Sequence, residues 1–464
     1  MGMRKHYRGD TSIPIEEWEN QEGRRFNLTS TAAAAAAPSS GGRAAERMNL
    51  PNAPIQMSSA PPNPTPPAAA AAASASWCGI LAAQIAKLLF FVHLLAFVIL
   101  VVFLLVHGFR HRSSTFHANH WFVPLLTSIA ASSVASLLVL LLTLRFPRLA
   151  LKNSLWLSPL LIFGLAFLLL GIGTSQGLAF AVLALILALA EALYACWIVP
   201  RLHHAYEVLS ASISAAQVPP STAAYASLTV LAGASYAAFW TLGVGGVAAD
   251  DDSRFGPLYV VVLLLNLAWT MQVIKYLAHA AVARLAHARL APWGEIEEGP
   301  GQAFWEVTTQ ALGDVCLGGT DEFLFSCTAC CAGVAEGMVT RGNRWGFVHI
   351  GAYRKGFAQA SWDVWDMFAR KGMGRLVDRD ITGSFCFMCG TAGGSTAALV
   401  AGSWVLALDK QLAGAAAVYP SRIAMAWPQA CVAAYHVVYA ENPHNRRLGS
   451  SLTDRIRELE LSPD

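Results

Sequence analysis

Residues 343–372 read NRWGFVHIGAYRKGFAQASWDVWDMFARKG, and they combine charge with aromatic rings in a chain that is otherwise poor in charge. Only 13% of the 464 residues are charged, yet seven charged side chains and three tryptophans fall within this stretch. At about 100° per residue, its apolar side chains fall on one side of a helix and its polar ones on the other. The stretch therefore predicts an amphipathic helix. Such a helix either lies flat at a membrane interface or crosses the membrane with its polar face toward other helices or a wet cavity.

The composition around this stretch predicts a membrane protein. The chain is 55% hydrophobic, and its mean hydropathy is +0.46. A soluble domain is about 45–50% apolar and about 25% charged. The formal net charge is only +3, and no basic tail or stacking surface suggests nucleic acid as a partner.

Ten apolar segments set the predicted architecture. An apolar helix of about 20 residues crosses the bilayer core. The segments are 80–106, 121–144, 154–174, 178–200, 223–248, 257–279, 308–338, 343–371, 381–408 and 413–440. The distribution of Lys and Arg in the loops places both termini in the cytoplasm. We therefore expect an all-α, polytopic membrane protein with about ten transmembrane helices, of which 308–338 and 343–371 are the least certain spans.

Composition also divides the chain into three parts. Residues 1–76 are rich in alanine and proline without apolar periodicity, which predicts a disordered tail. Residues 77–441 form the predicted helical domain, and 442–464 form a cytoplasmic tail.

Two CxxC pairs raise the question of a metal site. They are Cys327 with Cys330 and Cys386 with Cys389. In a soluble protein this spacing indicates zinc. Both pairs lie inside apolar runs, where small polarizable side chains pack between helices, so we expect neither a metal nor a cofactor.

Several blocks of sequence resemble the choline transporter-like family, especially its plant and algal members. They are NRWGFVHIGAYRKGF, the later DRDITGSFCF, LLNLAWTMQVIKYLAHAAVARL (264–285) and YAENPHNRRLGSSLTDRI (439–456). The resemblance covers roughly residues 80–456. It implies a ten-helix transporter with both ends in the cytoplasm, and the plasma membrane is the family's usual location. The short, cysteine-free loop at 107–120 and the acidic Thr320–Asp321–Glu322 depart from the family pattern.

Choline chemistry suggests where a binding site could lie. A quaternary ammonium has no N–H group, so aromatic faces attract it, helped by a carboxylate where water is scarce. Glu191, Tyr194 and Trp197 follow one another at i,i+3 spacing within an apolar run. A lone acid in such a run is a candidate for function. The alternative is a protonated or hydrogen-bonded structural glutamate, with Trp197 as an interfacial anchor.

Four further aromatic residues are weaker candidates for a cation cage, and packing explains each of them as well. They are Trp240, Trp269, Trp345 and Tyr353. Glycines such as Gly243, Gly245 and Gly246 predict close helix approach, as static packing or as compliance for transport.

The sequence thus predicts a transporter of choline or a related organic cation in a lipid bilayer. No nucleotide-binding loop is present, so transport would be facilitated or gradient-driven, and the chain would not be an enzyme. A non-transporting scaffold or a channel of the same topology is the main alternative. A membrane metal oxygenase is a minor one, suggested by the pairs His107 and His111 and His117 and His120. The adjacent pair His203–His204 stands alone, on the opposite predicted side of the membrane, which speaks against a shared metal.

Overall fold

The computed structural model describes the parts of the chain listed here, and every regular element within them is a helix. The described residues are 66–112, 116–173, 175–216, 221–250, 254–291, 299–328, 343–378, 380–408 and 419–461, all within one compact unit, Pro64–Asp464. Residues 1–65 of the predicted disordered tail lie outside them, and the first helix already begins at Pro66.

Seven stretches in these ranges are long and apolar enough to cross a membrane. They lie on α2 (Pro66–Arg110), α3 (Ala118–Arg145), α4 (Pro147–Ile172), α5 (Ser175–Ile198) continuing into α6 (Leu202–Ala216), α7 (Ser221–Ala249), α8 (Gly256–Leu290), and α14 (Gly374–Asp378) with α15 (Thr382–Leu408). The chain is therefore a polytopic helical membrane protein. The total of ten spans and the side on which the termini lie stay predictions.

The outer helices expose apolar side chains over much of their length. Leu88, Leu95 and Ile99 of α2 are 61–63% exposed, as are Ile186 and Leu193 of α5. A soluble protein rarely exposes contiguous apolar surface of this size. A lipid surrounding is favourable for these side chains, and the helices satisfy their own backbone hydrogen bonds within it.

The quoted stretch forms two helices, so the prediction of one continuous amphipathic helix over 343–371 is wrong. Helix α12 spans Asn343–Tyr353 and α13 spans Phe357–Arg370. The chain turns at Arg354, whose φ of 54° lies in the left-handed region, and Gly356 directly precedes α13. Much of α12 is buried, whereas α13 is amphipathic and exposes its charged face.

Two other predicted spans of the C-terminal half depart from a uniform α-helix in their described parts. Segment 308–338 begins in a π-helix, η2 (Val307–Ala311), which follows α9 (Pro300–Glu306) and leads into α10 (Leu312–Thr328). Its remainder lies outside the described residues. Segment 413–440 contains α16 (Tyr419–Ala424) and α17 (Ala426–Glu441), separated by a turn at Met425.

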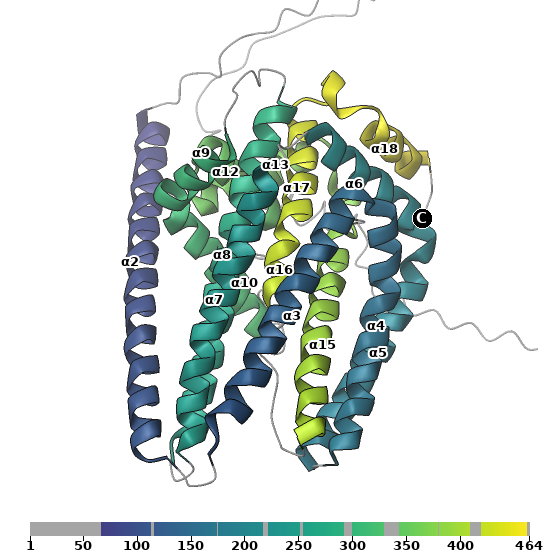
Figure 1. Ribbon diagram of the computed structural model, residues 1–464. Helices are drawn as coiled ribbons and strands as arrows, with labels where there is room; N and C mark the ends of the chain where they lie inside the picture. The colour runs from purple at the N-terminus through teal and green to yellow at the C-terminus, as the bar shows by residue number, and fades with distance from the viewer. Residues whose placement is uncertain are drawn as a thin grey trace, which may run out of the picture. The chain divides into compact units, whose positions relative to one another are not determined.

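Figure 1 shows α2 at one side of the described helices and α4 with α5 at the other. Helix α17 packs along α8, and α12 packs against α8, α13 and α17. The C-terminal segment η4 (Arg446–Leu448) and α18 (Ser451–Leu461) folds back onto α6. Within the predicted tail 442–464, this part is helical.

A second, smaller apolar core lies apart from the main one. Its buried members are Leu155, Ala195, Ile198 and Met388, from α4, α5 and α15. Helices α4 and α5 pack mainly on each other, and α4 also packs on α15.

Close approach of α2 and α7 depends on glycine, as the sequence predicts. A Cβ on Gly246 would lie 2.5 Å from the carbonyl oxygen of Leu104, and one on Gly108 would lie 2.0 Å from the carbonyl oxygen of Gly246. Backbones meet here without side chains between them, which is the packing mode of small residues in membrane helices.

We expect Gly246→Ala to destabilise the protein by about 1–3 kcal/mol, because overpacking of this size forces the α2 backbone away from α7. Thermal unfolding of the purified protein in detergent measures the change. Gly171→Ala on α4 is the matched control, since a Cβ there would meet nothing within 4 Å. Equal melting temperatures for the two variants would contradict the close packing of α2 on α7.

Candidate functional site

The seven aromatic and acidic residues singled out from the sequence lie on four helices. Glu191, Tyr194 and Trp197 belong to α5, Trp240 to α7, Trp269 to α8, and Trp345 and Tyr353 to α12. The rings of Tyr194 and Trp197 lie 5.9 Å apart, centroid to centroid.

Glu191 turns inward, toward the helices next to α5. It is 5% exposed, and its Oε2 lies 2.5 Å from Ser158 Oγ on α4. Ser158 Oγ in turn lies 2.6 Å from Thr391 Oγ1 on α15.

Trp197 lies differently from Glu191, although both are on α5. Its side chain is 57% exposed, and the Arg201 guanidinium lies over its ring, 4.2 Å from the centroid. An aromatic ring with a basic partner near a helix end fits an interfacial anchor. The structure thus gives Glu191 and Trp197 separate surroundings.

Trp240 and Trp345 are packing residues in their described contacts. Trp240 is 4% exposed and donates its indole N–H to the Leu263 carbonyl at 2.7 Å. Trp345 is 6% exposed and meets Phe368 edge to face, at 5.7 Å between ring centroids.

Trp269 belongs to a polar and aromatic cluster between α2, α7, α8 and α10. Its indole N–H donates to Thr320 Oγ1 at 2.9 Å, and its ring lies 4.4 Å from the His93 ring. Asn266 Nδ2 lies 2.7 Å from His93 Nε2, and the Tyr236 hydroxyl donates to Asn266 Oδ1. Polar groups inside a membrane protein are commonly paired in this way.

Tyr353 lies where α12 ends and meets a carboxylate from α17. Its hydroxyl donates to Glu441 Oε1 at 2.9 Å. The other Glu441 oxygen lies 3.0 Å from His287 Nε2, and His349 Nε2 lies 3.3 Å from Oε1. Glu441 is the last residue of α17 and lies outside the seven spanning stretches.

These contacts fix the charge of Glu441. Its burial alone would raise the pKa of the carboxyl, but hydrogen bonds from His287, His349 and Tyr353 outweigh it and lower the pKa to about 2. Burial and the negative charge of Glu441 raise the pKa of the Tyr353 hydroxyl, which therefore stays a hydrogen-bond donor.

Two further acids hold the break after Tyr353. Arg354 donates to Glu306 on α9, which also pairs with Arg284 at 2.8 Å. The backbone N–H of Phe357 donates to Asp314 Oδ1 on α10 at 3.0 Å. This N–H belongs to the first turn of α13 and has no partner within that helix, so Asp314 caps the helix at its positive end.

A pocket of about 350 Å³ lies beside the break. Its lining is His349, Tyr353, Lys355, Asp363, Asp366, Met367, Arg370 and Glu441. The Lys355 ammonium lies 5.5 Å from the centroid of the Tyr353 ring and 2.6 Å from Asp363 Oδ2. The ring therefore already has a cation over its face, supplied by the protein itself.

Sequence reasoning identified Tyr353 in this pocket but missed its most important partner, Glu441. The acid that ends an apolar run in YAENPHN was a usable signal. Its histidine partners lie 154 and 92 residues away in sequence, so only the fold shows the group.

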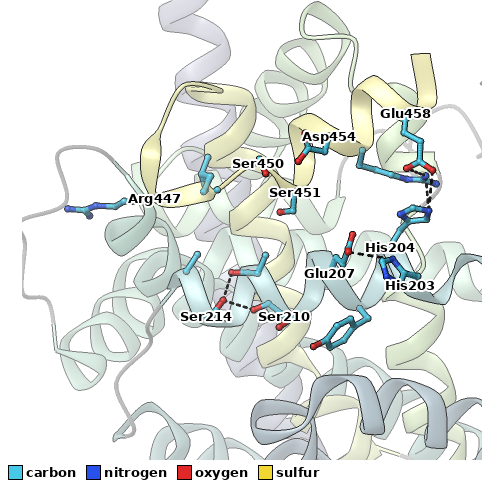
Figure 2. Close-up of a pocket in the computed structure, with 16 residues that line it drawn as sticks. His203, His204, Glu207, Ser210, Ser214, Arg447, Ser450, Ser451, Asp454 and Glu458 are labelled. Atoms are coloured by element: carbon cyan, nitrogen blue, oxygen red, sulfur yellow. Dashed lines mark hydrogen bonds and ion pairs between the residues drawn. The ribbon is translucent and has the colours of Figure 1, made fainter. Parts of the chain in front are cut away.

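A larger pocket of about 760 Å³ lies between α6 and the C-terminal segment (Figure 2). His204 Nε2 lies 3.0 Å from an Arg455 guanidinium nitrogen and 3.6 Å from Glu458 Oε1. Ligand atoms of His203, His204 and Glu207 lie within 4.8 Å of one another. Their types could hold a metal ion, although Arg455 already occupies one face of His204.

Similarity to known proteins is found in the region of the chain that builds the smaller pocket. The sequence model of a family described as "Plasma-membrane choline transporter" matches residues 306–440. Protein PNS1 of Mycosarcoma maydis is 21% identical over 182 residues, which cover 33% of this chain and 34% of that protein. The chain thus matches about a third of that relative's length.

The resemblance to the choline transporter-like family is confirmed. The match contains the whole lining of the smaller pocket except Glu441, which follows it directly. The seven spanning stretches show an integral membrane protein, in agreement with the family's description, which names the plasma membrane.

The Glu441 cluster should give the protein an acid-sensitive component of stability. Because the pKa is lower in the folded chain than in the unfolded one, this component is present above the ordinary value of 4.5 and is lost as the pH falls toward about 2. We expect the melting temperature of the wild type to fall in this window. Glu441→Gln should lower the melting temperature at neutral pH and flatten its fall toward acid.

Asp366→Asn is the control for this prediction, since Asp366 is an exposed acid of the same pocket. It should keep the acid-dependent fall. A Glu441→Gln curve parallel to the wild-type curve would show that Glu441 does not hold the cluster.

Proposed function

We propose that the protein transports choline or a related organic cation across a membrane, without ATP hydrolysis, by facilitated or gradient-driven movement. The match of residues 306–440 to the choline transporter family supports this, as do the seven spanning stretches. We further propose the plasma membrane as its location.

The observation that carries the proposal is the Tyr353–Glu441 pocket. A trimethylammonium group needs an aromatic face and a nearby negative charge, and the pocket offers both. Three carboxylates and two cationic side chains line it, which leaves one negative charge when His349 is neutral. The pocket thus balances one added positive charge.

The position of Lys355 indicates how a cargo cation would enter. Its ammonium lies over the Tyr353 ring and pairs with Asp363. An arriving organic cation would take the place over the ring, and Lys355 would move away while keeping Asp363. Lys355 is therefore a built-in competitor of the cargo.

Five other candidates are less suited to hold a cation, because their described contacts are with hydroxyls, aromatic rings, a carbonyl or a guanidinium of the protein. They are Glu191, Tyr194, Trp197, Trp240 and Trp345. The remaining candidate, Trp269, lies in a cluster with His93 and Tyr236, whose rings offer a second aromatic surface within the spans. We propose this cluster as a contact for a cation that is secondary to the Tyr353–Glu441 pocket. It ranks second because its described members include no carboxylate.

Uptake of radiolabelled choline into liposomes that contain the purified protein tests the function. We expect saturable uptake above protein-free liposomes, and competition by ethanolamine and thiamine shows the breadth of the cargo. A channel of the same topology would give uptake that does not saturate. A scaffold would give none, and either result would contradict the proposal.

Substitutions in the pocket test the site separately from the function. A cation over an aromatic ring contributes about 0.5–2 kcal/mol, so Tyr353→Leu should weaken apparent choline affinity by about 2- to 30-fold. Tyr353→Phe keeps the ring and should lose less. Lys355→Met should raise the affinity, because it removes the competing ammonium.

Trp362→Leu is the matched control on α13, since Trp362 is 67% exposed and does not line the pocket. It should leave uptake unchanged. Normal affinity in Tyr353→Leu would exclude this pocket as the cation site even if the protein transports choline.

A further inference from the structure

Glu191 is the acid buried deepest within a described spanning stretch, and the smaller pocket does not contain it. Helix α5 brings it against Ser158 of α4, and Ser158 contacts Thr391 of α15. The Thr391 hydroxyl also lies 3.0 Å from the carbonyl oxygen of Met388. Three helices are thus joined by a row of four oxygen atoms that begins at the carboxyl group.

A count of protons identifies the state in which every contact of this row is a hydrogen bond. The row contains three oxygen–oxygen contacts, of 2.5, 2.6 and 3.0 Å, and each hydrogen bond needs one proton. The Ser158 and Thr391 hydroxyls supply two protons, and the Met388 carbonyl supplies none. When all three contacts are hydrogen bonds, the third proton comes from the carboxyl group, which donates to Ser158, as Ser158 donates to Thr391 and Thr391 to Met388. The Thr391 hydroxyl also lies 3.3 Å from the carbonyl oxygen of Phe387.

The ionised alternative is poorly supported by its surroundings. It would leave the carboxylate with Ser158 as the donor to Oε2 and with Thr391 as the other nearby hydroxyl, which would have to turn away from Met388. Among the residues that the structure describes, nothing donates to Glu191 Oε1. A buried carboxylate keeps its charge when several donors or a cation hold it, whereas Glu191 faces two neutral hydroxyls and pairs with no cation of α4, α5 or α15 among the described residues.

The surroundings of the row are also dry. Leu155, Ala195, Ile198 and Met388 form the small apolar core beside it, between the carboxyl and the nearby end of α5. Glu191 precedes that end by seven residues, which is about 10 Å along a helix.

Few other titratable groups face this site. Helix α4 carries only Arg148 and Lys152, both in its first two turns, and α5 carries Tyr194 and Cys196 besides Glu191. Helix α15 contributes the buried thiols of Cys386 and Cys389. No cationic side chain of α4, α5 or α15 among the described residues pairs with Glu191.

We propose that Glu191, Ser158 and Thr391 form a buried proton-binding site that joins α5, α4 and α15. The carboxyl group holds the proton and donates to Ser158, Ser158 donates to Thr391, and Thr391 donates to the Met388 carbonyl. On release of the proton the row reverses, so that Thr391 donates to Ser158 and Ser158 donates to the carboxylate. The assignment stands whether or not the Tyr353–Glu441 pocket binds choline.

Infrared spectroscopy of the purified full-length protein in lipid nanodiscs tests the site directly. A protonated carboxyl has a carbonyl stretch that a carboxylate lacks. We expect this band at neutral pH in the wild type, its loss in Glu191→Gln, and its persistence in Glu441→Gln. Absence of any difference band between the wild type and Glu191→Gln at neutral pH would overturn the proposal.

A second variant keeps the test decisive if Glu191→Gln does not fold. Ser158→Ala removes the acceptor of the proposed carboxyl hydrogen bond, so the band should persist at a higher frequency. Thr391→Val, one step further along the row, should give a smaller shift. A band that does not move in Ser158→Ala would show that the protonated carboxyl belongs to another residue, such as Asp314.

Discussion

The hydrogen bonds around the break after Tyr353 organise the C-terminal half of the described structure. Helix α12 ends because three acids from three other elements bind the groups exposed there. Glu441 takes the Tyr353 hydroxyl, Glu306 takes the Arg354 guanidinium, and Asp314 takes the first N–H of α13. Each acid has a compensating partner, which is why charge can accumulate in a chain that otherwise contains little. The same contacts tie α9, α10 and α17 to one point.

The break also creates the chemistry of the pocket. In a continuous helix each residue turns by about 100°, so Lys355, two residues after Tyr353, would point to the opposite side. The turn instead brings the Lys355 ammonium over the Tyr353 ring. Glu441 completes the pocket from α17 and stays ionised because two histidines and a tyrosine hydroxyl stabilise it. The three acids lie outside the seven spanning stretches, while Arg284 and His287, which pair with Glu306 and Glu441, lie near the end of the stretch on α8. Two hydrogen-bonded polar clusters lie within those stretches, around Glu191 and around His93.

The long spans could be predicted from the sequence, and the interrupted helices could not. Segments 121–144, 223–248 and 381–408 appear as α3, α7 and α15 within a few residues, because uninterrupted apolar runs leave helix as the favourable backbone form in lipid. The break at 354–356 lacks such a signal. The helical pattern of apolar residues continues across it, and its left-handed residue is an arginine, with Gly356 as the one local hint.

The site residues divide in the same way. The cost of a lone acid in an apolar run pointed to Glu191, but its hydroxyl partner Ser158 lies 33 residues away, and Thr391 lies 233 residues beyond Ser158. Tyr353 was singled out for its ring, while the contacts of Glu441, Asp314 and Glu306 with the break were visible only in the assembled helices. For Trp197 the sequence pointed to a shared site that the fold does not form. Its spacing on α5 suggested that it lies with Glu191, but its side chain is exposed whereas Glu191 is buried.

The central claim is that the break after Tyr353 builds a cation site that Lys355 occupies when no cargo is bound. An experimental structure of the protein in lipid, determined with choline at saturating concentration, tests it most directly. We predict trimethylammonium density over the Tyr353 ring, near Glu441, with the Lys355 ammonium moved off the ring and still paired with Asp363. Choline density elsewhere in the bundle, with Lys355 still over the ring, would contradict it.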